Sequence, residues 1–558
     1  MPWSILSSML MLRARMTQML KSSGAMGAAT LISRILGFLR EAVYAAFMGD
    51  TAVASAFKFA FMIPNLFRRL LGEGALSAAF IPIFKEKEKR EGEASMWRAS
   101  NAVLSGLLAA STMLTLAVML GISLIFACST HLGTESAGIR LPFGRAIILQ
   151  PDTLLTLRLL RMMFPYLVMI CVTGVLFGML NARGYFFIPA SGAIVMNVIM
   201  IGSVYLLAPR MGATLRQQIF GLAIGALAAG FAQMAYQWLS LRREGFVYRW
   251  VSPWNDPTVR AVGRKMVPGM MGVAAFQLNV LITGMVSWNV DRTIFASFDY
   301  AVRLMELPQG MFGASLATYL LPTLSGLAAD KKYPEFRSAL RQGLSYLAFV
   351  NLIASILLVV LAEPIVRLLF EHGTLFTEAS TQRTSLALMM LAPGLIAFSF
   401  VNVLARAFYA LGDTMTPMKI SAFALGCNLA LGLALVWGLR QAGLGLANTL
   451  SATVNAGLLF FALRKKLKTL EFGGVKGLLA RLAICGCLAV AMAWLARVWC
   501  ESHWGHKTFP TRLVAVALPA LLAGGAYFAT AVFLRLEAAR DIAALFRRRL
   551  HRAGLENV

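Results

Sequence analysis

The chain has 558 residues, of which 58% are hydrophobic and only 14% are charged, and its mean hydropathy is +0.70. A soluble protein averages about 45–50% apolar and 25% charged residues, so this composition excludes a soluble globular domain, a disordered chain and a disulfide-rich secreted scaffold. The formal net charge is +27. Lys and Arg of membrane proteins gather in cytoplasmic loops, so this charge predicts a membrane topology and no nucleic-acid partner.

Apolar runs predict fourteen membrane spans, because a helix needs about 20 apolar residues to cross a bilayer. The splits at 290–293 and 439–442 are the least distinct. The expected spans are 24–48, 53–84, 99–127, 153–181, 187–208, 218–240, 266–290, 293–328, 342–370, 379–409, 417–439, 442–463, 476–499 and 510–536.

Basic and non-basic loops alternate along these spans, as a correct span count requires. The second set of loops is poorer in Lys and Arg, with Asp50 near the first of them. We therefore predict a multi-pass protein of the bacterial cytoplasmic (inner) membrane with both termini cytoplasmic. The basic set holds Lys85, Lys87, Lys89, Arg90, Arg183, Arg242, Arg243, Arg249, Arg260, Arg264, Lys265, Lys331, Lys332, Arg337, Lys419, Arg464, Lys465, Lys466, Lys468, Arg547, Arg548 and Arg549.

A weak internal repeat links the two halves of the chain. Pro165 with Ala182, Gly184 and Pro189 recurs 228 residues later as Pro393 with Ala410, Gly412 and Pro417, and Pro82 recurs 240 residues later as Pro322. The shorter offset implies extra residues in the first copy, which the non-periodic segment 128–152 can supply. Six spans per copy give parallel repeats, a design in which transporters bind substrate between two rocking halves.

These observations predict an all-α integral membrane protein with 14 transmembrane helices, arranged as two pseudo-symmetric six-helix lobes plus two C-terminal helices. The expected divisions are a cytoplasmic N-terminal segment (1–23), an N-lobe (24–245), a C-lobe (246–470), two further spans (471–546) and a cytoplasmic basic tail (547–558).

Ionisable residues at bilayer depth cost from about 2.5 to over 10 kcal/mol each, so each one indicates a functional site. They concentrate in three of the spans. The first holds Arg34, Arg40 and Glu41, the second holds Lys58, Arg68, Arg69 and Glu73, and the eighth holds Asp299, Arg303 and Glu306.

Helical spacing predicts partners for several of these charges, because residues three, four or seven apart share one face. Arg34 should face Glu41, and Arg69 should face Glu73. Arg303 should lie between Asp299 and Glu306, held by both carboxylates when no ligand is bound.

Arg40 and Arg68 have no carboxylate at such a spacing, so we expect them, with Arg303, to bind an anion from outside the helix. Arginine binds phosphate oxygens through two parallel hydrogen bonds and stays charged when buried, which suits a pyrophosphate. The alternative is that these arginines only form ion pairs between helices, or extend their charged ends to the membrane–water interface.

Prolines and glycines interrupt the second and eighth spans beside these charges. Interrupted helices at corresponding positions of two repeats are typical of a transporter binding site. The breaking residues are Pro64, Gly72, Gly74 and Pro82 in the second span, and Pro308, Gly310, Gly313 and Pro322 in the eighth.

The chain lacks the sequence motifs of metal-dependent enzymes, nucleotide-binding proteins and zinc proteins. Eight Asp without an Asp-rich motif argue against a metal-dependent enzyme of polyprenyl phosphates, and no Walker A motif, dinucleotide loop or Cys/His zinc spacing is present. The six cysteines are scattered through apolar segments and predict no disulfide framework. We therefore expect no catalytic residue, no metal and no cofactor, and a transporter in place of an enzyme.

Two motifs carry a family resemblance: Ser33-Arg34 through Gly37 to Arg40-Glu41, and Ile63-Pro64 through Arg68-Arg69 to Glu73-Gly74. With the segment from Arg303 through Glu306 and Pro308 to Gly310, the chain from about Leu20 to its end resembles the MurJ (MviN) lipid II flippases of the MOP exporter superfamily.

The resemblance implies fourteen helices, two lobes around a cationic central cavity, and a groove for the polyprenyl tail along the last two helices (471–546). It implies that lipid II, an undecaprenyl-pyrophosphate-linked disaccharide peptide, moves from the cytoplasmic to the periplasmic leaflet by alternating access in peptidoglycan synthesis. Arg34, Arg40, Arg68 and Arg303 match functionally important positions, with supporting or gating roles expected for Ser33, Glu41, Arg69, Glu73, Asp299 and Glu306.

Two residues depart from the family pattern: Ser55 stands where an acidic residue is frequent, and Val302 stands where an Asp often precedes the arginine. Asp299 can substitute for the latter. No sodium site is carried over, and the coupling ion is left open.

Three other functions stay open at this point. One is the export of another polyprenyl-linked oligosaccharide or, as a MOP-type exporter, of a drug, although an arginine-rich cavity disfavours cationic drugs. A second is a non-transporting scaffold for cell-wall enzymes that docks through the basic loop 242–265, and other cell-wall synthesis proteins are candidate partners. A third is an enzyme of polyprenyl chemistry.

Overall fold

The computed structural model describes residues 28–71, 75–132, 136–140, 146–467 and 475–544. The chain divides into two compact units, Met1–Leu281 and Ile282–Val558. The boundary falls inside helix α9, whereas the predicted lobes meet at 245/246. The division into lobes, terminal segments and two further spans stays a prediction.

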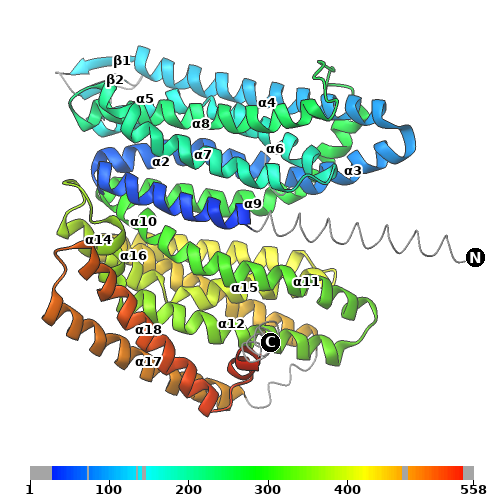
Figure 1. The fold of residues 1–558 in the computed structure, drawn as a ribbon. Helices are drawn as coiled ribbons and strands as arrows, with labels where there is room; N and C mark the ends of the chain where they lie inside the picture. Colours follow the sequence, from blue (N-terminus) through cyan, green and yellow to red (C-terminus); the bar gives the residue numbers. More distant parts are fainter. Residues whose placement is uncertain (1–27, 72–74, 133–135, 141–145, 468–474, 545–558) are drawn as a thin grey trace, which may run out of the picture. The chain divides into compact units, whose positions relative to one another are not determined.

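The first unit is built from helices and one small sheet (Figure 1). After a helix over 28–48 come α2 (Ala52–Leu71), α3 (Ala75–Glu91), α4 (Glu93–Ala127), β1 (Ser129–Leu132), β2 (Ser136–Arg140), β3 (Ala146–Leu149), α5 (Pro151–Met163), α6 (Tyr166–Ala182), α7 (Phe187–Leu206), the 3₁₀ turn η1 (Ala208–Met211), α8 (Leu215–Arg243) and α9 (Pro257–Val290).

The described regular elements of the second unit are all helices or helical turns (Figure 1). It contains α10 (Ile294–Pro308), the π-helical turn η2 (Gln309–Gly313), α11 (Ala314–Ala329), α12 (Tyr333–Val360), α13 (Ala362–Phe370), α14 (Glu378–Leu391), α15 (Gly394–Ala410), α16 (Met415–Lys466), α17 (Val475–Trp504), α18 (Phe509–Phe533) and a short helix over 537–544.

The described residues include eight helices long and apolar enough to cross a membrane, or ten if each of two bent pairs counts as one span. This confirms the predicted helical membrane class, whereas the number fourteen stays a prediction. The sheet was not predicted. Its strands pair antiparallel in the order β1-β2-β3, and they occupy the segment that the sequence showed only as non-periodic.

The two bent pairs lie at corresponding positions of the sequence repeat. Helices α5 and α6 meet at Pro165 with a bend of 41°, and α14 and α15 meet at Pro393 with a bend of 46°. A proline inside an apolar helix removes a backbone donor and clashes with the preceding turn, so each span bends there. Each pair also ends before a left-handed glycine, Gly184 at φ 89° and Gly412 at φ 74°.

Helix α16 is two helices joined by a break. A straight helix of its 52 residues would be about 78 Å long, far more than a bilayer requires. Arg440, at φ 49° and ψ −129°, interrupts the helical backbone, at the place where the sequence predicted a split. The two arms then pack on each other, and the buried Asn428 Nδ2 donates to Ser451 Oγ at 3.0 Å.

Small residues let the helices of the first unit approach closely. Gly225 of α8 faces Ser203 of α7, and a Cβ on the glycine would lie only 2.2 Å from the serine Cβ. Association of membrane helices depends on such contacts, because lipid offers no hydrophobic gain for bringing them together.

An ion-pair network connects α17 and α18 to α13 within the second unit. At its centre is Arg367 of α13, whose side chain is 6% exposed. Its guanidinium contacts Glu363 at 3.0 Å, Glu371 at 3.2 Å and Glu378 at 2.5 Å.

The same glutamates also bind arginines of the last two helices. Arg497 of α17 contacts Glu363 at 2.6 Å, and Arg512 of α18 contacts Glu371 at 3.0 Å. Arg512 also donates to the Glu371 backbone carbonyl at 2.6 Å. We name Arg367, Arg497, Arg512 and the three glutamates the Arg367 network.

A second contact between these helices is apolar. Phe349 of α12, Leu482 of α17 and Tyr527 of α18 belong to one buried cluster. The Tyr527 hydroxyl donates to the Phe349 carbonyl at 2.8 Å, which satisfies a polar group inside the cluster. Helices α17 and α18 run side by side and reach the rest of the second unit through these two regions (Figure 1).

The loop after the second bent pair contains a strongly perturbed carboxyl group. Asp413 accepts from Lys466 Nζ at 2.6 Å and from the Thr416 backbone N–H at 3.0 Å. These donors stabilise the carboxylate and lower the pKa of Asp413 to about 2.

The Arg367 network predicts a large cost for one substitution. Arg367→Ala should lower the free energy of unfolding by about 3–5 kcal/mol, because it removes a buried cation from among carboxylates. Unfolding of purified protein in detergent measures this, with Lys419→Ala, an exposed lysine near the start of α16, as the control. Equal unfolding midpoints for the two variants would contradict the network's role.

Candidate functional site

The first cationic cluster lies on the helix over 28–48 and its neighbours α2 and α7. Glu41 is 6% exposed and contacts two cations: Arg40 Nη2 at 2.6 Å and Lys58 Nζ at 3.3 Å. The side chains of Arg40 and Lys58 are only 15% and 7% exposed. One carboxylate therefore lies between two cations that are little exposed.

Arg40 is also held by groups from α7. Its Nη1 donates to Asn197 Oδ1 at 3.0 Å, and Asn197 Nδ2 donates to the Ser33 carbonyl at 3.2 Å. The guanidinium carbon lies 6.0 Å from the centre of the Tyr44 ring. Asn197 thus fixes Arg40 and the first helix together.

The sequence predicted other partners for these residues. Glu41 pairs with Arg40 and Lys58, so the expected contact of Arg34 with Glu41 is wrong. Arg34 is exposed, and its side chain makes no ion pair within the described part of the chain. The expectation that Arg40 lacks a carboxylate is also wrong, because its long side chain folds back to the adjacent glutamate.

Ser33 and Ser55 lie close to this cluster in the chain. The Ser33 hydroxyl donates to the Thr30 carbonyl at 3.0 Å, one helical turn away. Ser55 is fully buried on α2, one turn before Lys58. A neutral hydroxyl therefore stands at the position where an acidic residue was expected, one turn from Lys58.

The second cluster, on α10, confirms the predicted stripe. Arg303 Nη2 contacts Asp299 Oδ1 at 3.5 Å, and Arg303 Nη1 contacts Glu306 Oε2 at 2.9 Å. The Arg303 and Glu306 side chains are 34% and 44% exposed, so an incoming anion can reach the guanidinium. Val302, which stands where an Asp was expected, packs against the apolar cluster of Met305, Leu391 and Leu395.

The helix carrying Arg303 is interrupted directly after the stripe. Residues 309–313 form a π-helical turn, as the prolines and glycines of the eighth span led us to expect. Gly313 there approaches α15 so closely that a Cβ would lie 2.7 Å from Ser399 Oγ. Such turns are frequent at functional sites.

The remaining predicted residues lie partly or wholly outside the described structure. Arg68 and Arg69 belong to α2, and their side chains are not among those described. Glu73 lies outside the described residues, so the contact of Arg69 with Glu73 stays a prediction. Arg40 belongs to the first unit and Arg303 to the second.

The described residues contain no group of three His, Cys, Asp or Glu side chains that could hold a metal ion. The cysteines at the six positions are free thiols.

Sequence comparison assigns the chain to a known family. The family model described as "Lipid II flippase MurJ" matches residues 44–515. The chain belongs to the MurJ family. A Vibrio cholerae relative named "Probable lipid II flippase MurJ" is 32% identical over 492 residues, covering 86% of this chain and 89% of its own. A Burkholderia cenocepacia relative named "Lipid II flippase MurJ" is 31% identical over 442 residues, covering 78% and 82%.

Solved structures agree on the fold. One titled "Lipid II flippase MurJ, inward closed conformation" has a TM-score of 0.71 at 21% identity, covering 91% of this chain and 99% of that chain. An inward-facing multidrug resistance MATE family transporter of the MOP superfamily has a TM-score of 0.60 at 16% identity, covering 79% and 96%. The chain is thus a multi-pass membrane protein with the MOP transporter fold, and the predicted MurJ resemblance is confirmed.

The two clusters predict different costs for removing a carboxylate. Glu41→Ala should lower the free energy of unfolding by about 3–5 kcal/mol, because two buried cations lose the charge between them. Glu306→Ala, at a half-exposed pair, should cost about 1 kcal/mol or less. Thermal unfolding of both variants in detergent checks this difference, and an equal loss would show that Glu41 is not electrostatically buried.

Proposed function

We propose that this MurJ-family chain is a flippase and not an enzyme, and that it moves lipid II from the cytoplasmic to the outer leaflet of the bacterial inner membrane. The observation that carries the proposal is the family match over residues 44–515, together with relatives that are named lipid II flippases. Both termini are cytoplasmic in this proposal, and peptidoglycan synthesis is the process that uses the exported lipid.

Pyrophosphate recognition would use the two cationic clusters. Arg303 is the accessible one, and a phosphate oxygen would replace Glu306 on its guanidinium. Arg40 and Arg68 would contribute from the first unit, with Arg34 as a further cation. Glu41, Glu306, Asp299, Ser33, Arg69 and Glu73 would hold or release these arginines.

Alternating access would carry the headgroup across while the polyprenyl tail stays in lipid along 471–546. The lobes would rock about their interface, as in the MOP transporters that share the fold. Outward movement of a negative headgroup follows an inside-negative potential, which contributes about 2.3 kcal/mol per charge per 100 mV.

Arg303 provides the sharpest test of this function. In cells depleted of their own flippase, the unaltered chain should restore the appearance of lipid II in the outer leaflet. Arg303→Ala should reduce export roughly 10- to 100-fold, as expected for the loss of a charged hydrogen bond. Arg303→Lys should also fail, because a lysine cannot bind phosphate bidentately.

Lys419→Ala at equal expression is the control, since it removes an exposed cation near the start of α16. Full export by Arg303→Lys would contradict bidentate recognition. Failure of the unaltered, well-expressed chain would reject lipid II as its substrate and favour another polyprenyl-linked glycan.

A further inference from the structure

Helices α4 and α12 occupy corresponding places in the two copies of the sequence repeat. They begin at Glu93 and Tyr333, 240 residues apart, which is the repeat offset in this part of the chain. Helices α6 and α15 begin at Tyr166 and Gly394, 228 residues apart, which is the offset further along. Residues of the two units can therefore be compared position by position.

In the second unit, α17 covers one face of α12. Ile353 and Ile356 of α12 pack against the buried cluster that contains Leu482 of α17, and both are only partly exposed. Gly486 of α17 approaches this face so closely that a Cβ would lie 3.4 Å from Ile356 Cδ1. Small residues permit such close contacts between membrane helices. This face of α12 therefore binds a helix that the chain itself supplies.

The corresponding face of α4 is open in the described part of the first unit, where α4 forms one edge (Figure 1). Met113 and Leu116 come 240 residues before the two isoleucines of α12, and they are 61% and 60% exposed. Leu120 and Leu124 extend the same side of the helix and are 62% and 54% exposed. We name these four residues the α4 stripe.

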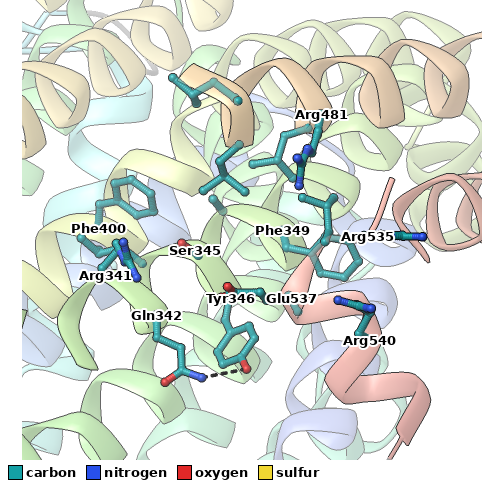
Figure 2. A pocket seen from close by; sticks show the side chains of 18 of the residues that line it. Arg341, Gln342, Ser345, Tyr346, Phe349, Phe400, Arg481, Arg535, Glu537 and Arg540 are labelled. Carbon is teal, nitrogen blue, oxygen red and sulfur yellow. Dashed lines mark hydrogen bonds between the residues drawn. The ribbon is translucent and has the colours of Figure 1, made fainter. Parts of the chain in front are cut away.

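A cavity of about 390 Å³ lies directly before the α4 stripe along the helix. Phe231 of α8, which is 57% exposed, lines it, so the cavity opens at the surface of the first unit. Three of its lining residues have counterparts that line a cavity between α12 and α17 in the second unit (Figure 2). The pairs are Leu104 with Leu344, Leu108 with Ala348, and Val172 with Phe400. The two units thus repeat both the face and the cavity, and among the described residues only the second unit has a helix over them.

The segment after α8 closes one end of the first unit's cavity and is fixed on α4. Tyr248 lines the cavity, and its hydroxyl lies 3.2 Å from Ser105 Oγ. Asn101 Nδ2 donates to the Val247 carbonyl at 3.1 Å. The Val251 N–H donates to Ser105 Oγ at 3.3 Å. The segment therefore has a defined position beside the cavity.

This end of the face is basic and aromatic. Arg242, Arg243 and Arg249 are exposed, and none of them makes an ion pair with a described residue. Trp250 and Trp254 are also exposed. Basic loops with nearby tryptophans are typical of the cytoplasmic surface of a membrane protein. A helix on the α4 stripe would match these arginines if acidic residues flanked its cytoplasmic end.

We propose that the α4 stripe and its cavity are the docking site for one transmembrane helix of another membrane protein, with acidic residues beside the cytoplasmic end of that helix. The helix takes the place on α4 that α17 holds on α12, with a small residue at the closest approach. One of its apolar side chains enters the cavity, and its acidic flank binds Arg249 and the arginines at the end of α8. The repeat favours a helix over bulk lipid, because a helix covers the equivalent face of the second unit.

Photocrosslinking in the cells that naturally express the full-length chain tests this site. With p-benzoylphenylalanine in place of Leu116, we expect crosslinks to one other membrane protein. The crosslinked peptide should come from a transmembrane helix that has Asp or Glu beside its cytoplasmic end. The same photoreactive residue in place of Trp437, an exposed apolar position of α16, is the control and should not capture this protein.

The same experiment distinguishes the other occupants. Lipid adducts alone at Leu116 overturn the proposal, because lipid then covers the α4 stripe. Crosslinks to a second copy of this chain also overturn it, as does equal capture of one protein from Leu116 and Trp437.

Two bulky substitutions test the packing of the captured protein, whose association with the full-length chain is measured by energy transfer in lipid vesicles. Leu116→Trp with Leu120→Trp should weaken association at least about tenfold, because the larger rings separate the two helices. Phe423→Trp with Leu433→Trp adds the same rings at exposed positions of α16 and should leave association within about twofold. Equal weakening in both double variants would reject the α4 stripe as the contact.

A charge variant leaves the apolar face unchanged. Arg242→Gln with Arg249→Gln should weaken association about three- to tenfold at low salt, and high salt should remove the difference, because exposed charges are screened. Lys331→Gln with Lys465→Gln removes the same charge from exposed positions of the second unit and should leave association within about twofold. An equal loss in both would mean diffuse attraction and would contradict the acidic flank.

Discussion

Charges inside a membrane protein must find partners within the protein, because lipid offers them none. This constraint explains the arrangement of both units. Glu41 lies between Arg40 and Lys58, Arg303 lies between Asp299 and Glu306, and Arg367 lies among three glutamates. Each of these buried or half-buried charges thus has a partner of opposite sign within the protein.

Burial determines what such a pair can do. An anion that reaches Arg303 replaces the carboxylate of Glu306, and the released Glu306 remains hydrated because its side chain is 44% exposed. Releasing Glu41 would instead leave a carboxylate in a dry environment, which costs several kcal/mol. The α10 cluster is therefore suited to exchange of partners, whereas the ion pairs of the Arg40 cluster are suited to holding the helices in place.

Interactions within one helix could be predicted from the sequence, and those between helices could not. The stripe of Asp299, Arg303 and Glu306 follows from spacing alone. Asn197 lies 157 residues from Arg40, and no spacing in the chain indicates that they meet. The predicted ion pair of Arg34 with Glu41 is absent because the Glu41 carboxylate binds Lys58 of another helix and the adjacent Arg40.

Two other features were missed for different reasons. The three short strands lie in a segment without clear apolar alternation, so no periodic signal indicated them. The Arg367 network was missed although Glu363 and Glu371 are each four residues from Arg367. These residues lie at the end of the expected span 342–370, and the other arginines of the network come from α17 and α18, which no spacing relates to them.

The π-helical turn at 309–313 sets the rotational phase of everything that follows it. One residue added to a helix turns all later side chains by about 100° around the axis. The face of α11 that packs on α12 and α15 is therefore not a continuation of the charged stripe on α10. Chain length within these five residues is consequently as constrained as their identity, since losing one would direct apolar packing residues of α11 toward the charged side.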